Sequence, residues 1–329
     1  MNKARLVAGL IAGVSVTITM AGAGASVWFF RHERPAAVRA QVFVLPPASS
    51  APYPQSAISH PSPLHYLGVV ERNTPSTYRP VTNFTSVAGR RPNITVYYSQ
   101  WGSNFRARFA TAAARAGAVV LVQMQPWHAS LAAIAGGRWD SYLRRFAGQV
   151  RRYGGQVILS FAPEANGRWY PWGWGHASPA RWVAAWRHVV TVFRNSDAIN
   201  VTWLWDVSGR NRTTGRIRNW WPGPRYVDWI GVDGYYFTRG DTFKTVIGST
   251  VQNVRRFTRK PILVSEVGIG PRAGQAAKIP GLFAGLRRDR LLGLIWFDVI
   301  QQQGLYHQNW RLSGRAAVAA FRAGVRSLH

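Results

Sequence analysis

The sequence predicts an α/β protein whose main domain is a closed (β/α)8 TIM barrel. Eight short apolar runs rich in β-branched residues recur along the chain, and stretches with the amphipathic spacing of helices lie between them. Such near-continuous apolar strands are typical of a parallel sheet covered by helices. A six-stranded open sheet would leave two runs unexplained, and no glycine-rich phosphate loop follows the first run.

Two segments precede the predicted barrel. Residues 1–31 are expected to form a signal peptide or a membrane-anchor helix, because the uncharged run 6–30 is about as long as a bilayer-spanning helix. The small residues 21–25 are an alternative signal-peptidase site, but the apolar run continues past them, which favours the anchor. Residues 32–63 are rich in Pro, Ala and Ser and are expected to form an extended linker. We therefore expect a protein on the extracellular face of the cell membrane, or a secreted one.

The barrel domain is expected over residues 64–329. The predicted strands share runs of β-branched or aromatic side chains bounded by turn residues, and they are 66–70, 93–101, 118–126, 156–164, 200–207, 228–236, 261–270 and 291–299. The predicted helices share amphipathic spacing, and they are 104–116, 139–153, 179–194, 242–258, 274–288 and 315–326. Ser178 before Pro179 and Asp241 before Thr242 are the expected N-terminal caps.

The composition narrows the possible partners and cofactors. The chain has 41 Lys plus Arg against 12 Asp plus Glu, a net charge of +29, and no cysteine. Disulfides and cysteine-ligated metals are therefore excluded, and the scattered histidines lack ligand spacing, so we expect neither a metal nor another cofactor. The basic residues form no nucleic-acid module, so no nucleic-acid partner is expected. The charge indicates either attraction to anionic cell-envelope polymers or an arginine-rich solvated surface, and the sequence leaves both open.

Two of the four glutamates fall at the ends of predicted strands. Glu164 is expected to close the fourth strand and Glu266 the seventh, so both are expected at the same mouth of the barrel. Two carboxylates facing across a cleft suit glycosidic bond cleavage, because one protonates the leaving oxygen while the other attacks the anomeric carbon. Strands four and seven lie on opposite sides of the mouth, which predicts a separation of about 5–5.5 Å and a retaining mechanism. The alternative is a pair of unrelated surface or salt-bridged acids.

The stretch SFAPEANGRWYPWGW, residues 160–174, resembles the acid/base motif of glycoside hydrolase family 26. That motif reads His-Glu-x-Asn-Gly-x-Trp-Tyr-x-Trp-Gly in this family of retaining (β/α)8-barrel glycosidases, which includes β-mannanases. Further runs resemble the family in order along the chain: WVAAWRHVVTVFR, INVTWLWDV, YVDWIGVDGYY, KPILVSEVGIG and LIWFDV followed by NWRL. The likeness extends from residue 66 to the end of the sequence.

The resemblance implies roles for individual residues. Glu164 matches the general acid/base and Glu266 the nucleophile, while Tyr235 matches a tyrosine that hydrogen-bonds the nucleophile. Asn166 and Trp169 fall where the family shapes the sugar site beside the acid. The other expected substrate-binding residues are Trp296 on the cleft floor, Trp127 and His128 after the third strand, and Trp172 in the motif.

Sixteen tryptophans add to the expectation of a sugar ligand. Flat indole rings offer apolar faces for pyranose C–H groups. Tryptophans on the expected mouth loops are interpreted as sugar platforms, and they are Trp169, Trp172, Trp174, Trp220, Trp221 and Trp296. Those within expected helices and strands are interpreted as core residues, and they are Trp182, Trp186, Trp203 and Trp205. The aspartates Asp233 and Asp298 are expected to make structural hydrogen bonds to arginine, and binding of sugar hydroxyls is the alternative.

One position departs from the family pattern, since Pro163 stands where the family has histidine. Proline donates no hydrogen bond there and is expected to hold Ala162 in an extended conformation. The expected function is a retaining, endo-acting hydrolase of a β-1,4-mannan-type polysaccharide, with mixed-linkage β-glucan and β-1,3-xylan left open. The alternatives are a non-catalytic glycan-binding protein of the cell envelope and a transglycosylase on the same barrel.

Overall fold

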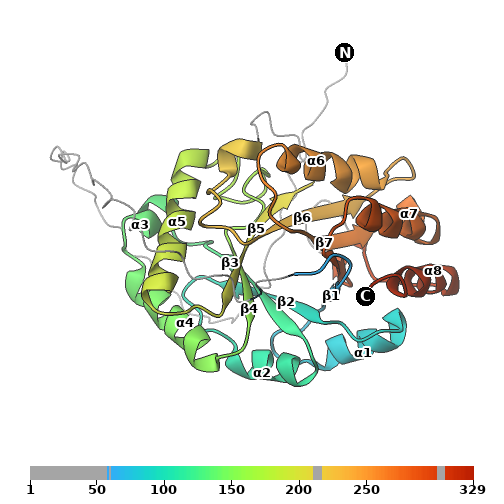
Figure 1. Cartoon of the computed structure of the whole chain (residues 1–329), viewed down its shortest axis with the longest axis horizontal. Coiled ribbons are helices and arrows are strands. Elements are labelled where there is room, and N and C mark those ends of the chain that lie inside the picture. The colour runs from blue at the N-terminus through green and yellow to red at the C-terminus, as the bar shows by residue number, and fades with distance from the viewer. Residues whose placement is uncertain (1–57, 59–60, 210–216, 302–307) are drawn as a thin grey trace, which may run out of the picture. The chain divides into compact units, whose positions relative to one another are not determined.

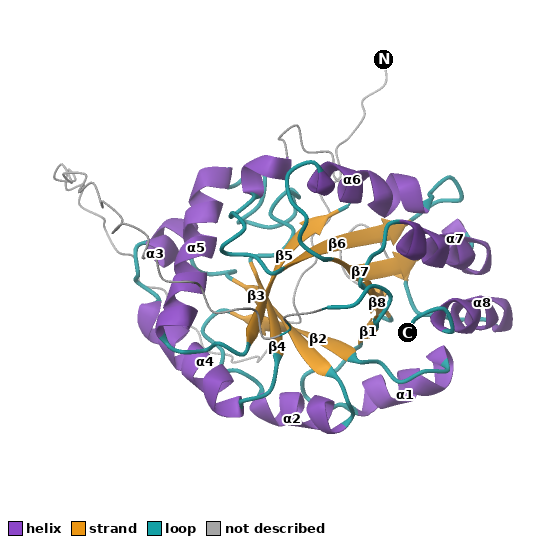
Figure 2. Cartoon of the chain, viewed as in Figure 1, coloured by secondary structure: helices purple, strands orange, loops and turns teal. Residues whose placement is uncertain are grey.

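The computed structural model describes residues 58, 61–209, 217–301 and 308–329. They contain a closed barrel of eight parallel strands in the order β1 to β8, with β8 hydrogen-bonded back to β1. Helices surround the strands, as Figures 1 and 2 show. The predicted barrel is therefore confirmed. The predicted anchor and almost all of the predicted linker lie outside the described residues, and no described helix has the length and apolar character needed to span a bilayer.

The eight barrel strands agree with the predicted runs, although most are shorter. They are β1 (Tyr66–Val70), β2 (Ile94–Gln100), β3 (Val119–Gln125), β4 (Val157–Phe161), β5 (Val201–Ser208), β6 (Trp229–Tyr236), β7 (Ile262–Ile269) and β8 (Gly293–Phe297). The short strands β9 (Ile300–Gln301) and β10 (Gln308–Asn309) pair antiparallel after the barrel.

The helices are those predicted plus two that the periodicity did not indicate, α1 and α3. They are α1 (Arg79–Ala88), α2 (Ala107–Arg115), α3 (Leu131–Ala135), α4 (Asp140–Tyr153), α5 (Pro179–Asn195), α6 (Ser249–Arg255), α7 (Gln275–Arg288) and α8 (Arg315–Val325). A π-helical turn, η2 (Lys244–Gly248), leads into α6, and short 3₁₀ turns form η1 (Ile217–Trp220) and η3 (Pro271–Ala273).

One expected helix cap is confirmed and the other is wrong. The Ser178 hydroxyl accepts a hydrogen bond from the Arg181 N–H at 3.3 Å, at the start of α5. Asp241 instead turns back to its own loop, where its carboxylate accepts bonds from the N–H groups of Phe237 and Thr238. The hydroxyl of Thr242 accepts from the Thr245 N–H and caps this turn instead.

Alternate residues of each strand point into the barrel, as the two-residue period of a strand requires. The deep interior is one apolar cluster, formed by Tyr66, Val70, Ile94, Val96, Leu121, Ile158, Leu204, Trp229, Leu263, Leu292 and Ile295. Two residues further along several strands, the inward positions become polar or phenolic. Apolar side chains therefore fill the deep interior of the barrel, and polar or phenolic side chains lie at the carboxyl ends of its strands.

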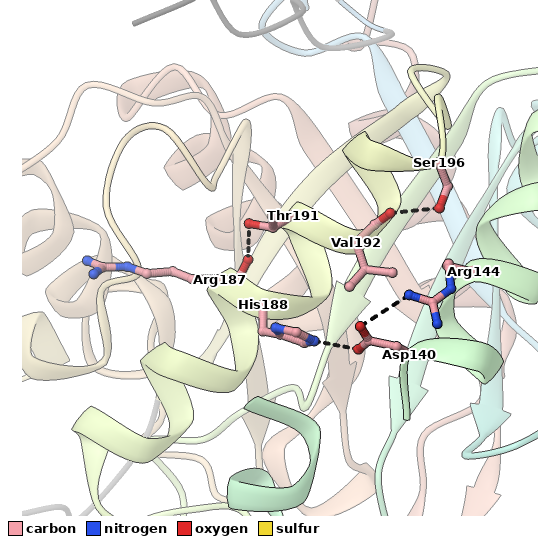
Figure 3. Close-up of polar contacts among 7 residues, drawn as sticks. All are labelled: Asp140, Arg144, Arg187, His188, Thr191, Val192 and Ser196. Atoms are coloured by element: carbon pink, nitrogen blue, oxygen red, sulfur yellow. Dashed lines mark hydrogen bonds and ion pairs between the residues drawn. The ribbon is translucent and has the colours of Figure 1, made fainter. Parts of the chain in front are cut away.

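Outward-facing strand residues pack against the helices, and the four tryptophans expected in the core are buried there. Trp203 contacts Trp186 of α5 edge-on, with ring centroids 6.2 Å apart. Helices α4 and α5 are joined by Asp140, whose carboxylate lies 2.6 Å from His188 Nε2 and 3.3 Å from Arg144 (Figure 3). These contacts fix the helix that follows the loop carrying Glu164.

Candidate active site

A bulge in β7 directs two consecutive side chains into the barrel. On the β6 side Gly231 pairs with Leu263 but Asp233 pairs with Glu266, so β7 contains one extra residue, and the register with β8 shifts over the same stretch. Consecutive strand residues normally point to opposite faces, and a bulge re-aims one of them. Ser265 and Glu266 both contact inward-facing side chains as a result. The strand continues to residue 269, so Glu266 lies within β7 rather than at its end.

Glu266 is 6% exposed and is held by two phenols. The Tyr98 hydroxyl donates to Oε1 and the Tyr235 hydroxyl donates to Oε2, each at 2.5 Å. Burial, together with the charge of Asp206, raises the pKa of the Glu266 carboxyl to about 7, and the two phenol hydrogen bonds act in the opposite direction. The expected bond between Tyr235 and the carboxylate at 266 is present.

Tyr98 was missed by the sequence reasoning, although its position on β2 was readable. It lies two and four residues after Val96 and Ile94, which face the barrel interior, so the strand period places it above them at the mouth. The residue is 37% exposed, while its hydroxyl reaches the buried carboxylate of Glu266. On the other side, Trp310 packs on the ring of Tyr235 with centroids 4.9 Å apart and holds that phenol in place.

Glu164 lies three residues beyond β4, on a turn with unusual backbone angles. Ala162 and Glu164 have φ values of +46° and +51°, in the left-handed region that non-glycine residues seldom adopt. The expectation of an extended Ala162 before the proline is therefore wrong. The turn is pinned on both sides, since the Ala162 N–H donates to the Met124 carbonyl at 2.8 Å and its carbonyl accepts from the Trp182 indole at 3.0 Å. Tertiary contacts override the local preference here.

The carboxyl of Glu164 is 7% exposed and is contacted by the indole of Trp169, which donates to Oε2 at 2.9 Å. Burial raises its pKa well above the ordinary value, and the charges of Glu266 and Asp206 raise it further. The hydrogen bonds from Trp169 and from the Ser208 side chain oppose this shift. The two short phenol hydrogen bonds favour the anion of Glu266, and its charge in turn keeps the proton on Glu164. The pair therefore separates into a proton donor and an anion.

The loop after Glu164 is clamped to the end of β5. The Asn166 side chain exchanges two hydrogen bonds with the backbone of Ser208, each at 2.9 Å, and is 1% exposed. The structure thus places Asn166 as an anchor of this loop. Position 167 requires glycine because the Trp169 ring packs close to its backbone, and a Cβ built there would lie 2.3 Å from that ring.

Beside the two glutamates lies an aromatic cluster formed by Trp127, Tyr170 and Trp172. Trp172 is 2% exposed, stacks on Tyr170 at 4.4 Å and donates to the Pro163 carbonyl at 2.8 Å, so it supports the acid turn. Half-buried Trp127 meets both other rings edge-on. Tyr170, missed by the sequence reasoning, has a phenol whose pKa is raised by burial and by the charges of nearby carboxylates, those of Glu164 and Glu266 first.

Two expected contacts of the cleft lie elsewhere. Trp296 is fully buried and faces away from the barrel interior, with its ring 5.2 Å from Phe321 of α8, so its assignment to the cleft floor is wrong. Its neighbour Phe297 faces the mouth and packs edge-on against Tyr235 at 5.5 Å. Trp220, also expected at the mouth, is fully buried against Trp182 of α5. Among the remaining assignments, His128 is exposed on the loop after β3 and Trp174 and Trp221 are partly buried.

Beneath the glutamates, Asp206 and Asp233 share the hydroxyl of Ser265, at 3.1 Å and 2.6 Å. A hydroxyl has one hydrogen and can donate to only one carboxylate at a time, so a second proton is needed to satisfy both contacts. Burial and the charge of Asp206 raise the pKa of Asp233 well above its ordinary value, and Asp233 therefore carries that proton. Burial raises the pKa of Asp206 to about 6, although the 2.6 Å hydrogen bond that Gln123 donates to it acts in the opposite direction. Among the residues that the structure describes, no arginine pairs with Asp233, whereas Arg311 does approach Asp298 at 3.9 Å.

Comparison with known proteins agrees with this geometry. A model described as glycosyl hydrolase family 26 matches residues 126–267, a range that contains both glutamates. Endoglucanase H of Acetivibrio thermocellus is 28% identical over 263 residues, which cover 74% of this chain and 29% of that protein. β-1,3-Xylanase TXYA of a Vibrio species is 26% identical over 135 residues, which cover 40% of this chain and 28% of that protein. The chain thus spans less than a third of the length of each of these relatives.

Among solved structures, an endo-β-1,4-mannanase double mutant of Cellulomonas fimi shares the fold, with a TM-score of 0.62 and 16% identity over 80% of this chain and 70% of that one. The chain therefore shares its barrel fold with this structure, and its sequence is similar to those of glycoside hydrolases. The part of the chain between residues 126 and 267 is thus similar to glycosyl hydrolase family 26, as the motifs predict.

Proposed function

We propose that the protein is a retaining, endo-acting β-glycoside hydrolase in which Glu164 is the acid/base and Glu266 is the nucleophile. The observation that carries the proposal is the unequal treatment of two buried, electrostatically interacting carboxyls at one barrel mouth. Two phenols donate to the anion of Glu266, whereas Glu164, which accepts from Trp169 and Ser208, is kept protonated by burial and by the charges of Glu266 and Asp206. A protonated donor beside an ionised nucleophile is what double displacement requires.

In the proposed reaction, Glu266 attacks the anomeric carbon and forms a covalent glycosyl ester while Glu164 gives its proton to the departing oxygen. As the ester forms, the negative charge on Glu266 is lost, which lowers the pKa of Glu164 because that charge had raised it. Glu164 then takes a proton from the incoming water, which cleaves the ester with overall retention. Tyr98 and Tyr235 hold the Glu266 oxygens during both steps.

We propose a β-1,4-mannan-type polysaccharide as the substrate, with mixed-linkage β-glucan and β-1,3-xylan as the specific competitors. The curated relatives are named as an endoglucanase and a β-1,3-xylanase, which supports including all three in one test. The partly exposed rings of Tyr98, Trp127 and Trp169 beside the glutamates support a polysaccharide ligand, because flat aromatic faces stack on sugar rings.

A substrate panel with matched variants tests the proposal. Release of reducing sugar from mannan, mixed-linkage β-glucan and β-1,3-xylan is measured for the wild type, Glu164→Ala and Glu266→Ala. The proposal expects product from the wild type on one polymer, retention of anomeric configuration by NMR, and losses of several orders of magnitude in both variants. Binding without product in the wild type would favour the glycan-binding alternative, which Pro163 motivates because this position lacks a hydrogen-bond donor. Products longer than the substrate, formed with an added oligosaccharide acceptor, would favour transglycosylation.

A further inference from the structure

A second feature of interest lies on the outer surface, in a groove between α1 and α2, which are neighbours in the helix ring (Figure 1). The groove encloses about 310 Å³ and is lined by Tyr78, Val81, Thr82, Thr85, Arg91, Ala112, Arg115 and Ala116. This volume is suited to a single small group such as a phosphate or one sugar acid. The groove lies against the helices, outside the barrel interior that holds the glutamates.

The groove contains cations without anionic partners. Arg91 and Arg115 are both exposed, and neither pairs with a carboxylate among the residues that the structure describes. The surrounding sequence explains this, because residues 72 to 139 contain eight arginines and no aspartate or glutamate. Guanidinium groups bind oxyanions through paired N–H donors.

An unsatisfied hydroxyl lies in the same groove. The oxygen of Tyr78 is buried and has no hydrogen-bond partner among the described residues. Its ring is fixed against Phe109 of α2, with centroids 5.8 Å apart. Burial raises the pKa of this phenol and the nearby charge of Arg91 acts in the opposite direction, so the hydroxyl is a neutral donor close to a guanidinium. Buried hydroxyls usually find a partner, and a bound oxyanion would supply one here.

We propose that the α1–α2 groove binds an oxyanion group, a phosphate or a carboxylate, carried by an anionic glycan. Arg91 and Arg115 supply the charge, and the hydroxyl of Tyr78 supplies a donor at the floor. This site is independent of the proposed hydrolysis, and it would retain the enzyme on an anionic polymer while the barrel mouth acts on a neutral one.

The test distinguishes specific binding in the α1–α2 groove from nonspecific attraction by the net charge of the protein. Binding of glucose 1-phosphate, glucuronate and glucose is followed by NMR titration with the wild type, Arg91→Gln/Arg115→Gln, Tyr78→Phe and the control Arg152→Gln/Arg181→Gln. The control removes the same charge from exposed arginines of α4 and α5, which make no side-chain ion pair with a described carboxylate.

We expect the wild type and the control to bind at least one of the two anions at least 10-fold more tightly than glucose. The Arg91/Arg115 variant should lose that preference, and Tyr78→Phe should weaken it severalfold. Preference for one anion identifies a phosphate or a carboxylate as the source. Equal losses in both double variants, or no preference in the wild type, would overturn the proposal.

Discussion

Replacing Tyr98 with phenylalanine removes one of the two phenol bonds to the buried carboxylate of Glu266 and leaves the ring in place. A hydrogen bond to a charged group contributes about 1.5–3 kcal/mol. Because Tyr235 keeps its own bond to the same carboxylate after the substitution, we expect a value near the lower end of that range. Since one pKa unit corresponds to about 1.4 kcal/mol, the pKa of Glu266 should rise by about one unit from its value of about 7.

The direction of this shift follows from the role of the bond. A donor to the carboxylate favours its ionised form, so losing the donor extends the pH range over which Glu266 stays protonated and inactive. The acid limb of the kcat/KM profile should therefore move up by about one pH unit, with about a 10-fold loss at pH 6 that shrinks as the pH rises. The measurement is a full pH–rate profile of Tyr98→Phe.

The neighbouring tyrosine provides the control. Tyr97 points away from the barrel interior, packs edge-on against Phe109 and accepts the Arg106 N–H at 3.3 Å. Tyr97→Phe should leave both limbs of the profile unchanged. A loss in Tyr98→Phe by the same factor at every pH, or an unmoved acid limb, would refute the assignment of Tyr98 as a stabiliser of the Glu266 anion.

Three further predictions each specify the direction of the expected effect. Asp206→Asn removes a charge that raises the pKa of both glutamates, so both limbs of the profile should move to lower pH by about one unit, and an unshifted profile would contradict this. Gly167→Ala forces the Trp169 ring away from Glu164 and should lower kcat/KM by about 2- to 10-fold, whereas Gly281→Ala, which has open space around it, should not. The raised pKa of Glu266 means that the folded state binds more protons than the unfolded chain between about pH 4.5 and 7, so wild-type stability falls as the pH rises through this window. Glu266→Gln lacks this loss and should gain up to about 3 kcal/mol over the wild type in urea unfolding between pH 4.5 and 8, and an equal pH dependence in both proteins would contradict it.

The fold was predictable because parallel strands buried on both faces leave long apolar runs in the sequence. The eight strands were found at their observed places, whereas α1 and α3 were not. The helix α3 has only five residues, too short for a recognisable period, and α1 begins at Arg79 in a polar stretch whose buried face consists of three residues, Val81, Phe84 and Ala88.

The site was only partly predictable. Their places at predicted strand ends and the family resemblance indicated the two glutamates. The two-residue period of the strands would have identified Tyr98 as inward-facing and Trp296 as outward-facing had it been applied to each strand. The bulge that directs Glu266 inward next to Ser265 has no sequence signal of this kind, because it depends on the register of both neighbouring strands. Likewise, the left-handed Ala162 before Pro163 results from tertiary hydrogen bonds that local preference opposes.

The most direct test of the proposed chemistry is to trap the covalent intermediate. A 2-deoxy-2-fluoro glycoside with a good leaving group, matched to the preferred polymer, slows hydrolysis of the ester more than its formation. Peptide mass spectrometry should then find the sugar attached to Glu266 and to no other residue, with little labelling in Glu266→Gln. A sugar attached to another carboxylate, or no attachment while the enzyme turns over its polymer with retention, would contradict the central claim.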